Sequence, residues 1–260
     1  MLDSALRILG VYRVYEERLR AQVEREEIPG HIGIILDGNR RWASSQGLSE
    51  GIGHEEGANR AEDLLDWCHD LRIKTVTLYV LSTENLVRTP DELRELFVLI
   101  EARLRHLLND DRIVKDRVKV KAIGQLDLLP ASIRDLLGEI ERKTSGYDDH
   151  YLNIAVAYGG RAEITDMVKS VARDVRDGKL SPEQITEETV SGRLYTSFLP
   201  NQEPDLIIRT SGEERMSGFM LWQGAYSELV FVDVFWPSFR KIDLMRAIRT
   251  YQRRTRRRGL

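Results

Sequence analysis

Three polar segments of the sequence contain the residue types that hold phosphate groups and a divalent cation. They are residues 37–41 (Asp-Gly-Asn-Arg-Arg), 82–88 (Ser-Thr-Glu-Asn-Leu-Val-Arg) and 209–217 (Arg-Thr-Ser-Gly-Glu-Glu-Arg-Met-Ser). The guanidinium group of arginine donates paired hydrogen bonds to phosphate oxygens, and a hydroxyl adds a donor. A carboxylate beside phosphate oxygens and water makes the oxygen-rich shell that Mg²⁺ prefers. The simpler alternative is a set of turn acids with solvated arginines.

Each polar segment follows a short apolar run that is typical of a strand buried on both faces. Strands are expected at 32–36, 74–81, 118–123, 151–158, 205–208 and 229–235, and helices at 54–71, from 90 through 108, at 130–143, 161–177 and 187–195, and from 241. Thr89, Pro90 and Glu92 form a capping-box pattern at the start of the second of these helices. This alternation predicts a single α/β domain with a six-stranded, mostly parallel sheet flanked by helices. Ligands of such sheets bind beyond the carboxyl ends of the strands.

Composition limits the function classes. The net charge of −3 gives no general attraction to nucleic acid or anionic membranes, and Cys68 has no partner for an intrachain disulfide. No apolar run reaches the roughly 18–20 residues that span a bilayer. Residues 1–28 are expected to carry an amphipathic helix that docks on its own domain, residues 29–260, with membrane-surface association as the alternative. We expect a cytoplasmic protein, with membrane association left open.

Common phosphate-binding motifs are absent. The sequence has no Gly-x-x-x-x-Gly-Lys-Ser/Thr loop, and no Gly-x-Gly-x-x-Gly follows a strand. Asp110-Asp111 and Asp148-Asp149 lack the further acid of an aspartate-rich Mg²⁺ motif. Glu228 begins an apolar run and could reach the same pocket as Asp37, where two carboxylates would share a metal ion.

Longer segments resemble the signature regions of the cis-prenyltransferases, the undecaprenyl (polyprenyl) diphosphate synthase family. They are residues 29–43, 75–88, 152–161 and 205–231, which occur in the family's order. The resemblance implies a homodimer with a hydrophobic tunnel between sheet and helices. It implies condensation of isopentenyl diphosphate with an allylic prenyl diphosphate, giving a longer cis-polyprenyl diphosphate and diphosphate. A peripheral membrane contact for product release is left open, and no nucleic acid is expected.

The resemblance also implies a role for individual residues. Asp37 and Glu228 would hold Mg²⁺, and Asn85 would accept a proton in a network with Asp37 and Arg88. The allylic diphosphate would be held at a helix start by Gly38, Asn39, Arg40 and Arg41, with His54 reaching it from the next helix. Isopentenyl diphosphate would be held by Arg209, Arg215 and Ser217. Further substrate contacts are expected from Trp42, Ser82, Thr83, Glu84, Arg88 and Met216.

The sequence departs from the family pattern at several positions. Glu50 stands where an arginine that contacts the allylic diphosphate is usual, and Leu86 stands where a tryptophan is usual. Ala157 replaces an asparagine, and Glu214 occupies a position sometimes filled by a metal-reaching histidine. Two alternatives therefore stay open: a prenyltransferase of this fold with an altered donor or acceptor, and a non-catalytic partner subunit.

The tunnel and the C-terminus give two further expectations. Leu93, Phe97, Ile100, Leu104 and Leu108 form an apolar stripe that lines the tunnel or packs as ordinary core. Residues 257–259 (Arg-Arg-Gly) resemble an Arg-x-Gly ending that reaches into a partner subunit's site.

Overall fold

A six-stranded sheet with the order β3-β4-β2-β1-β5-β6 forms the centre of the molecule, and every neighbouring pair is parallel. The computed structural model describes residues 11–254. The strands are β1 (His31–Ile35), β2 (Thr75–Ser82), β3 (Val118–Ile123), β4 (His150–Tyr158), β5 (Leu206–Arg209) and β6 (Glu228–Phe231). The predicted single-domain α/β fold is confirmed, and the sheet is parallel throughout.

Alternate residues of the central strands point to opposite faces of the sheet, and both faces are buried. Ile34 and Leu78 belong to the larger hydrophobic core, whereas their neighbours Ile35 and Tyr79 belong to a second core on the other face. Successive side chains of a strand point in opposite directions, so burial of both sets requires a cover on each face. The continuous apolar runs of the sequence reflect this two-sided burial.

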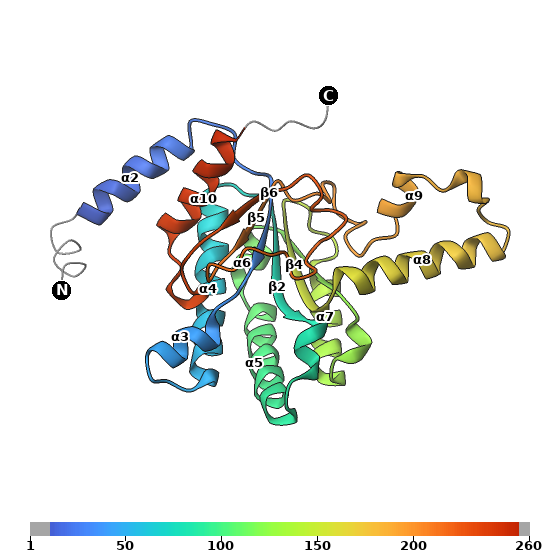
Figure 1. Cartoon of the computed structure of the whole chain (residues 1–260), viewed down its shortest axis with the longest axis horizontal. Helices are drawn as coiled ribbons and strands as arrows, with labels where there is room; N and C mark the ends of the chain where they lie inside the picture. The colour runs from blue at the N-terminus through green and yellow to red at the C-terminus, as the bar shows by residue number, and fades with distance from the viewer. Residues whose placement is uncertain (1–10, 255–260) are drawn as a thin grey trace.

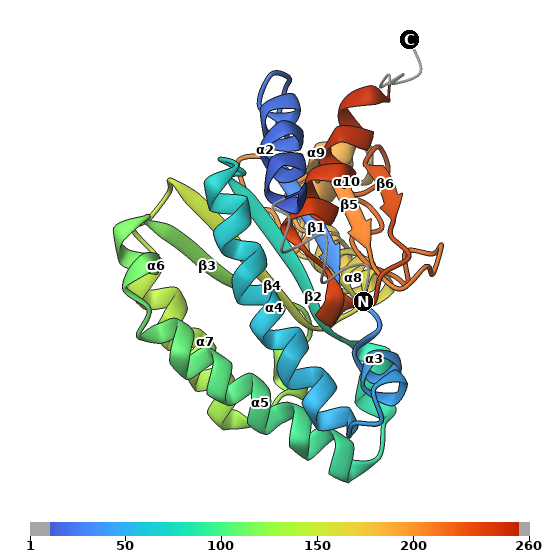
Figure 2. The ribbon, with the colours of Figure 1, turned by 90° about the vertical axis from the view of Figure 1, so that its left-hand side faces the viewer.

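Helices cover the face that carries the larger core (Figure 2). The helices of the chain are α2 (Val11–Val23), α3 (Asn39–Ser45), α4 (Glu50–Asp70), α5 (Pro90–Leu108), α6 (Asp111–Lys115), α7 (Ala131–Thr144), α8 (Gly160–Arg176), α9 (Glu187–Ser191) and α10 (Lys241–Arg253). Short 3₁₀ turns are η1 (Thr83–Val87), η2 (Leu126–Leu128), η3 (Pro182–Gln184) and η4 (Trp236–Ser238). Among the helices, α4, α5, α7 and α10 contribute most of the helical side chains of the larger core. Helix α8 extends away from the body of the molecule (Figure 1).

The N-terminal helix α2 packs against α10, as expected for a helix that docks on its own domain. Leu19 and Val23 are buried in the larger core, and Gln252 donates a hydrogen bond to the Val23 carbonyl at 2.9 Å. Arg246 of α10 lies over the ring of Tyr15 at 5.3 Å. The expected helical residues before 11 and the Arg-Arg-Gly ending lie outside the described residues. Within residues 11–254, no helix has the length and apolar content needed to cross a bilayer.

Local sequence signals account for several boundaries. The Thr89 hydroxyl accepts from the Glu92 amide, and the Glu92 carboxylate accepts from the Thr89 amide, so the predicted capping box starts α5. Strand β6 is shorter than expected and ends at Phe231. Beyond it, the Val232 and Val234 carbonyls accept hydrogen bonds from Gly212 and Ser211 instead. This pairing attaches the loop after β5 to the chain after β6.

Candidate active site

The three polar segments meet at one edge of the sheet because β1 lies between β2 and β5. Ile35, at the end of β1, is in register with Tyr79 of β2 and with Arg209, the last residue of β5. Parallel strands leave the sheet on the same side, so the loops that follow them begin close together. The expectation that these segments share one edge is confirmed.

Asp37 forms an ion pair with Arg209 at the centre of this edge. The Arg209 Nη2 lies 2.8 Å from the Asp37 Oδ2, and the arginine side chain is 5% exposed. Burial raises the pKa of Asp37, but the hydrogen bond and charge of Arg209, together with Ser211 and Arg41, hold that pKa below its ordinary value. Asp37 is therefore an ionised carboxylate that is 27% exposed and can accept a cation.

The backbone of Asp37 is fixed by residues that follow the other strands. Its amide donates to the Thr210 hydroxyl at 3.0 Å, and that hydroxyl donates to the Asp37 carbonyl at 2.7 Å. The Trp236 amide also donates to the Asp37 carbonyl at 3.0 Å. These bonds set the position of the carboxylate before any ligand arrives.

Arg41 connects Asp37 to the loop after β5. Its Nη2 donates to the Asp37 Oδ1 at 3.2 Å and to the Ser211 hydroxyl at 2.6 Å. Its Nη1 donates to the Glu213 Oε1 at 3.0 Å, and Arg215 Nη1 lies 2.5 Å from the Glu213 Oε2. Glu213 therefore bridges two of the arginines that the sequence assigned to different diphosphates.

The loop of residues 209–217 is shaped around the buried Arg209. Arg209 donates to the Ser217 hydroxyl at 2.7 Å and to the Arg215 carbonyl. Ser211 and Ser217 have left-handed backbones, with φ of 76° and 46°, which non-glycine residues adopt only when the surroundings enforce it. Met216 packs against the second hydrophobic core, so its side chain supports the loop.

The segment after β2 forms the turn η1, which a second capping box starts. The Ser82 hydroxyl accepts from the Asn85 amide, and the Asn85 Oδ1 accepts from the Ser82 amide, both at 3.2 Å. The Thr83 hydroxyl lies close to Gly159, where an added Cβ would come within 2.6 Å of it. Among the described residues, no side-chain hydrogen bond joins Asn85 to Asp37 or Arg88, so the expected three-residue network is not formed.

A second charged group lies between α3, α4 and α5. Arg40 Nη1 lies 3.6 Å from Glu92 and 3.9 Å from Glu50, so Glu50 is paired with a cation. Burial and the nearby Arg40 lower the pKa of Arg88. Burial, Arg88 and Arg40 lower the pKa of His54 to about 4, so its imidazole is neutral at pH 7. His54 can donate a hydrogen bond to a phosphate oxygen.

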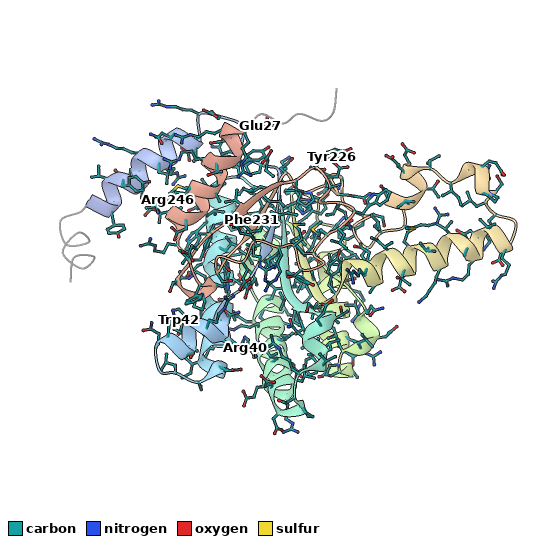
Figure 3. The ribbon with its side chains drawn as sticks, in the orientation of Figure 1. Glu27, Arg40, Trp42, Tyr226, Phe231 and Arg246 are labelled. Atoms are coloured by element: carbon teal, nitrogen blue, oxygen red, sulfur yellow. The ribbon has the colours of Figure 1, made fainter. Side chains whose placement is uncertain are left out.

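Gly38 and Gly57 make close contacts that fix the position of the backbone between Asp37 and Arg40. Gly38 has φ of 108°, and a Cβ there would lie 2.8 Å from the Phe235 ring. The Asn39 amide donates to the Leu36 carbonyl at 3.3 Å, and its buried Oδ1 has no hydrogen-bond partner. Gly57 of α4 packs against that oxygen so closely that a Cβ would come within 2.2 Å. Trp42 lies on the side of α3 away from α5 (Figure 3).

Glu228 lies at the opposite edge of the sheet from Asp37, so the prediction that both hold one metal ion is wrong for a single chain. Glu228 is the first residue of β6 and is in register with Leu206, the first residue of β5. Three residues of strand, roughly 10 Å, separate that register from Arg209. The Glu228 carboxylate instead forms an ion pair at 2.9 Å with Arg254, the residue that follows α10.

A cavity of about 600 Å³ lies between α4, α5 and the sheet. Asn39 and His54 are among the residues that line it, and its walls are mostly apolar. The apolar α5 side chains in the wall are Leu96, Leu99, Ile100, Leu104 and Leu107. The sequence stripe is therefore right for Ile100 and Leu104, whereas Phe97 and Leu108 pack against the core. Leu86, at the departure from the family pattern, also packs against the core.

The carboxylate at the site suits a Mg²⁺ ion that is bound partly by the protein and partly by the phosphates of the substrate. Within the part of the chain that the structure describes, no group of three or more His, Cys, Asp or Glu side chains could hold a metal ion. Mg²⁺ commonly binds through one or two carboxylates plus substrate phosphates and water, and the partly exposed, ionised Asp37 fits that donor set.

Sequence reasoning missed Glu213 as a member of this site. The fold brings Glu213 beside Arg41 through a loop whose left-handed residues give no sequence signal. Its position between Ser211-Gly212 and Arg215, in a segment already assigned to phosphate binding, was the available clue.

Comparisons with known proteins agree with this geometry. The pattern of the family described as "Putative undecaprenyl diphosphate synthase" matches residues 35–259. The chain is 53% identical over its whole length to a tritrans,polycis-undecaprenyl-diphosphate synthase (geranylgeranyl-diphosphate specific) of Methanopyrus kandleri, covering 96% of that protein. It is 49% identical to the Thermoplasma acidophilum protein of the same name, covering 95% of each chain. A crystal structure of lavandulyl diphosphate synthase from Lavandula x intermedia with dimethylallyl diphosphate has a TM-score of 0.87 and 33% identity, over 90% of this chain and 99% of that one.

Proposed function

The chain belongs to the undecaprenyl diphosphate synthase family of prenyltransferases, and we propose that its starter substrate is geranylgeranyl diphosphate. The enzyme lengthens an allylic prenyl diphosphate with isopentenyl diphosphate. Relatives at 53% and 49% identity carry the description geranylgeranyl-diphosphate specific, which supports the choice of starter. The observation that carries the mechanism is the Asp37–Arg209 pair next to an apolar cavity, which is lined by Leu36 and Asn39 on either side of Asp37 in the sequence.

The charges at the sheet edge provide binding sites for two diphosphates. Arg41, Arg40 and the neutral His54 would hold the allylic diphosphate, whose chain then lies in the cavity beside His54. Arg209, Arg215 and Ser217 would hold isopentenyl diphosphate. Fixing both molecules in one orientation supplies much of the rate enhancement, because the reacting carbons are then held together.

Departure of the allylic diphosphate separates charge, and the site holds groups that stabilise the leaving anion. Arginine donors that are already positioned lower the barrier more than mobile ones. Mg²⁺, held by Asp37 and diphosphate oxygens, would neutralise charge on the leaving group. Asn85 stays our candidate for accepting the proton that isopentenyl diphosphate loses; its Oδ1 already accepts one hydrogen bond, from Ser82, which leaves one lone pair.

We also propose a homodimer and Mg²⁺ dependence, as the family resemblance implies. The exposed apolar side chains of Leu221, beside Gly160 of α8, and Trp222, beside Ser191 of α9, support a subunit contact. Light scattering coupled to gel filtration measures the mass directly. Removal of Mg²⁺ by a chelator is expected to stop turnover, and its return is expected to restore it.

The function is tested by incubating the purified protein with Mg²⁺, labelled isopentenyl diphosphate and allylic diphosphates of increasing length. We expect efficient conversion of geranylgeranyl diphosphate to long products and slower use of farnesyl and dimethylallyl diphosphate. A product that contains one added unit in a branched arrangement would instead support the altered-acceptor alternative. No incorporation with any starter would support a non-catalytic subunit.

A further inference from the structure

Glu213 is the acidic side chain that joins the two diphosphate sites. Its Oε1 lies 3.0 Å from Arg41 and its Oε2 lies 2.5 Å from Arg215, so one carboxylate contacts a cation of each site. The established chemistry of the family does not require this bridge. The effect of the Glu213 bridge on binding depends on which of its contacts a diphosphate must replace.

Arg41 has two acidic partners, and they differ in how firmly they are held. Asp37 is also bound by the buried Arg209 and by Thr210 through its backbone. Glu213 is held by Arg41 and Arg215, whose side chains are 45% and 64% exposed. Exposed ion pairs contribute only about 0–1 kcal/mol each, so Glu213 is the partner that yields to a diphosphate.

We propose that Glu213 acts as an internal competitor of both substrates and thereby couples their binding. This inference rests on the proposed function of the site. The first diphosphate to bind replaces the carboxylate on one arginine and, because both groups are negative, repels it from the other. Once the carboxylate has been displaced, the second diphosphate meets a free guanidinium and a weaker repulsion. Each substrate therefore tightens the binding of the other, and by linkage the two factors are equal.

The test measures dissociation constants by calorimetry in Mg²⁺, using isopentenyl diphosphate and the unreactive geranylgeranyl thiodiphosphate, each alone and each with the other saturating. For the wild type we expect each ligand to tighten the other about 5-fold or more, which is the usual lower range of coupling between sites. In Glu213→Gln we expect each single ligand to bind several-fold more tightly and the coupling factor to approach one. The neighbouring Glu214→Gln removes the same charge from an exposed residue and is expected to keep the coupling.

Glu213→Asp tests whether the negative charge alone is enough or the bridge is needed. The shorter side chain keeps the carboxylate but cannot span both arginines. We expect coupling to be lost in Glu213→Asp as well. Weaker single-ligand binding in Glu213→Gln, or unchanged coupling, would overturn the proposal and would make Glu213 a structural residue of the loop. If neither ligand binds the wild type, the proposed function fails instead, so the two failures can be told apart.

Discussion

The arginines at the carboxyl ends of the strands are paired with acidic side chains. Arg209 and Arg41 contact Asp37, Arg215 contacts Glu213, and Arg40 lies near Glu50 and Glu92. A diphosphate must therefore replace existing ion pairs. The affinity of each site is the difference between the new contacts and the old ones, and single acidic residues can adjust it.

Glu50→Arg is expected to lower the Michaelis constant for the allylic substrate several-fold. The change removes an acid 3.9 Å from Arg40 and adds a cation near Arg88. A hydrogen bond to a charged group contributes roughly 1.5–3 kcal/mol, and partial exposure reduces this gain. Steady-state kinetics with varied allylic substrate measure the effect, and a constant Michaelis constant for isopentenyl diphosphate is the internal control. An unchanged Michaelis constant for the allylic substrate would mean that residue 50 does not face the allylic diphosphate.

Two of the errors at the residue scale, those for Glu228 and Glu213, have physical causes. Glu228 precedes its apolar run, whereas Asp37 and Arg209 end theirs, so parallel strands place Glu228 at the other edge of the sheet. This could have been deduced from the sequence order alone. The bridge made by Glu213 could not, because it depends on the left-handed backbone of Ser211 and Ser217.

Helix packing sets the position of the segment that carries Asn39, Arg40 and Arg41. The helices α3 and α4 approach closely because Gly53 and Gly57 have no side chains; a Cβ at Gly53 would lie 2.4 Å from the Asn39 carbonyl. Sequence patterns predicted α4 but started it four residues late, and α3 was implied only by the family resemblance, as the helix start that holds residues 38–41. The close approach of two helix backbones at glycines does not change the spacing of apolar residues, so apolar periodicity does not predict it.

Gly57→Ala is expected to reduce activity at least 10-fold and to destabilise the protein by about 1–3 kcal/mol, since the new methyl group overlaps the Asn39 Oδ1 and forces α3 to shift. Chemical denaturation and turnover measure the two effects. Gly146→Ala is the control, because nothing lies within 4 Å of a Cβ there. Normal turnover of Gly57→Ala would show that the position of α3 is not critical.

His31 gives the sheet a pH-dependent stability. Burial lowers its pKa from 6.5 to about 4, and its Nε2 bonds to the Thr77 hydroxyl at 2.8 Å. Between these pH values the unfolded chain binds more protons than the folded one. Stability is therefore full above about pH 6.5 and falls by up to about 3 kcal/mol as the pH decreases to 4. Urea denaturation across this range should show a smaller loss in His31→Gln than in the wild type; equal losses would contradict the assignment.

The whole molecule combines a polar edge with an apolar cavity under α4 and α5. The sequence predicted the sheet and its parallel direction, because strand and helix periodicities are strong in this chain, whereas a tunnel between sheet and helices was implied by the family resemblance. Of the α5 residues that line the cavity, the sequence predicted only Ile100 and Leu104. That choice depends on the rotation of α5, which places Leu96, Leu99 and Leu107 in the wall.

Ala61→Phe is expected to shorten the products by at least one five-carbon unit, since Ala61 lines the cavity and a ring there takes space from the growing chain. Chromatographic sizing of labelled products measures the change. Ala102→Phe, on an exposed position of α5, is the matched control and should leave the length distribution unchanged. An identical distribution for Ala61→Phe would mean that the chain takes another path.

The most direct test of the central claim is the turnover of Asp37→Asn with geranylgeranyl diphosphate, isopentenyl diphosphate and Mg²⁺. The substitution keeps the shape of the side chain and a hydrogen bond to Arg209 but removes the negative charge next to both diphosphates. We expect turnover to fall at least 100-fold, while the melting temperature stays within a few degrees of the wild type and the protein remains folded. Turnover close to that of the wild type would contradict the assignment of Asp37 as the centre of the site.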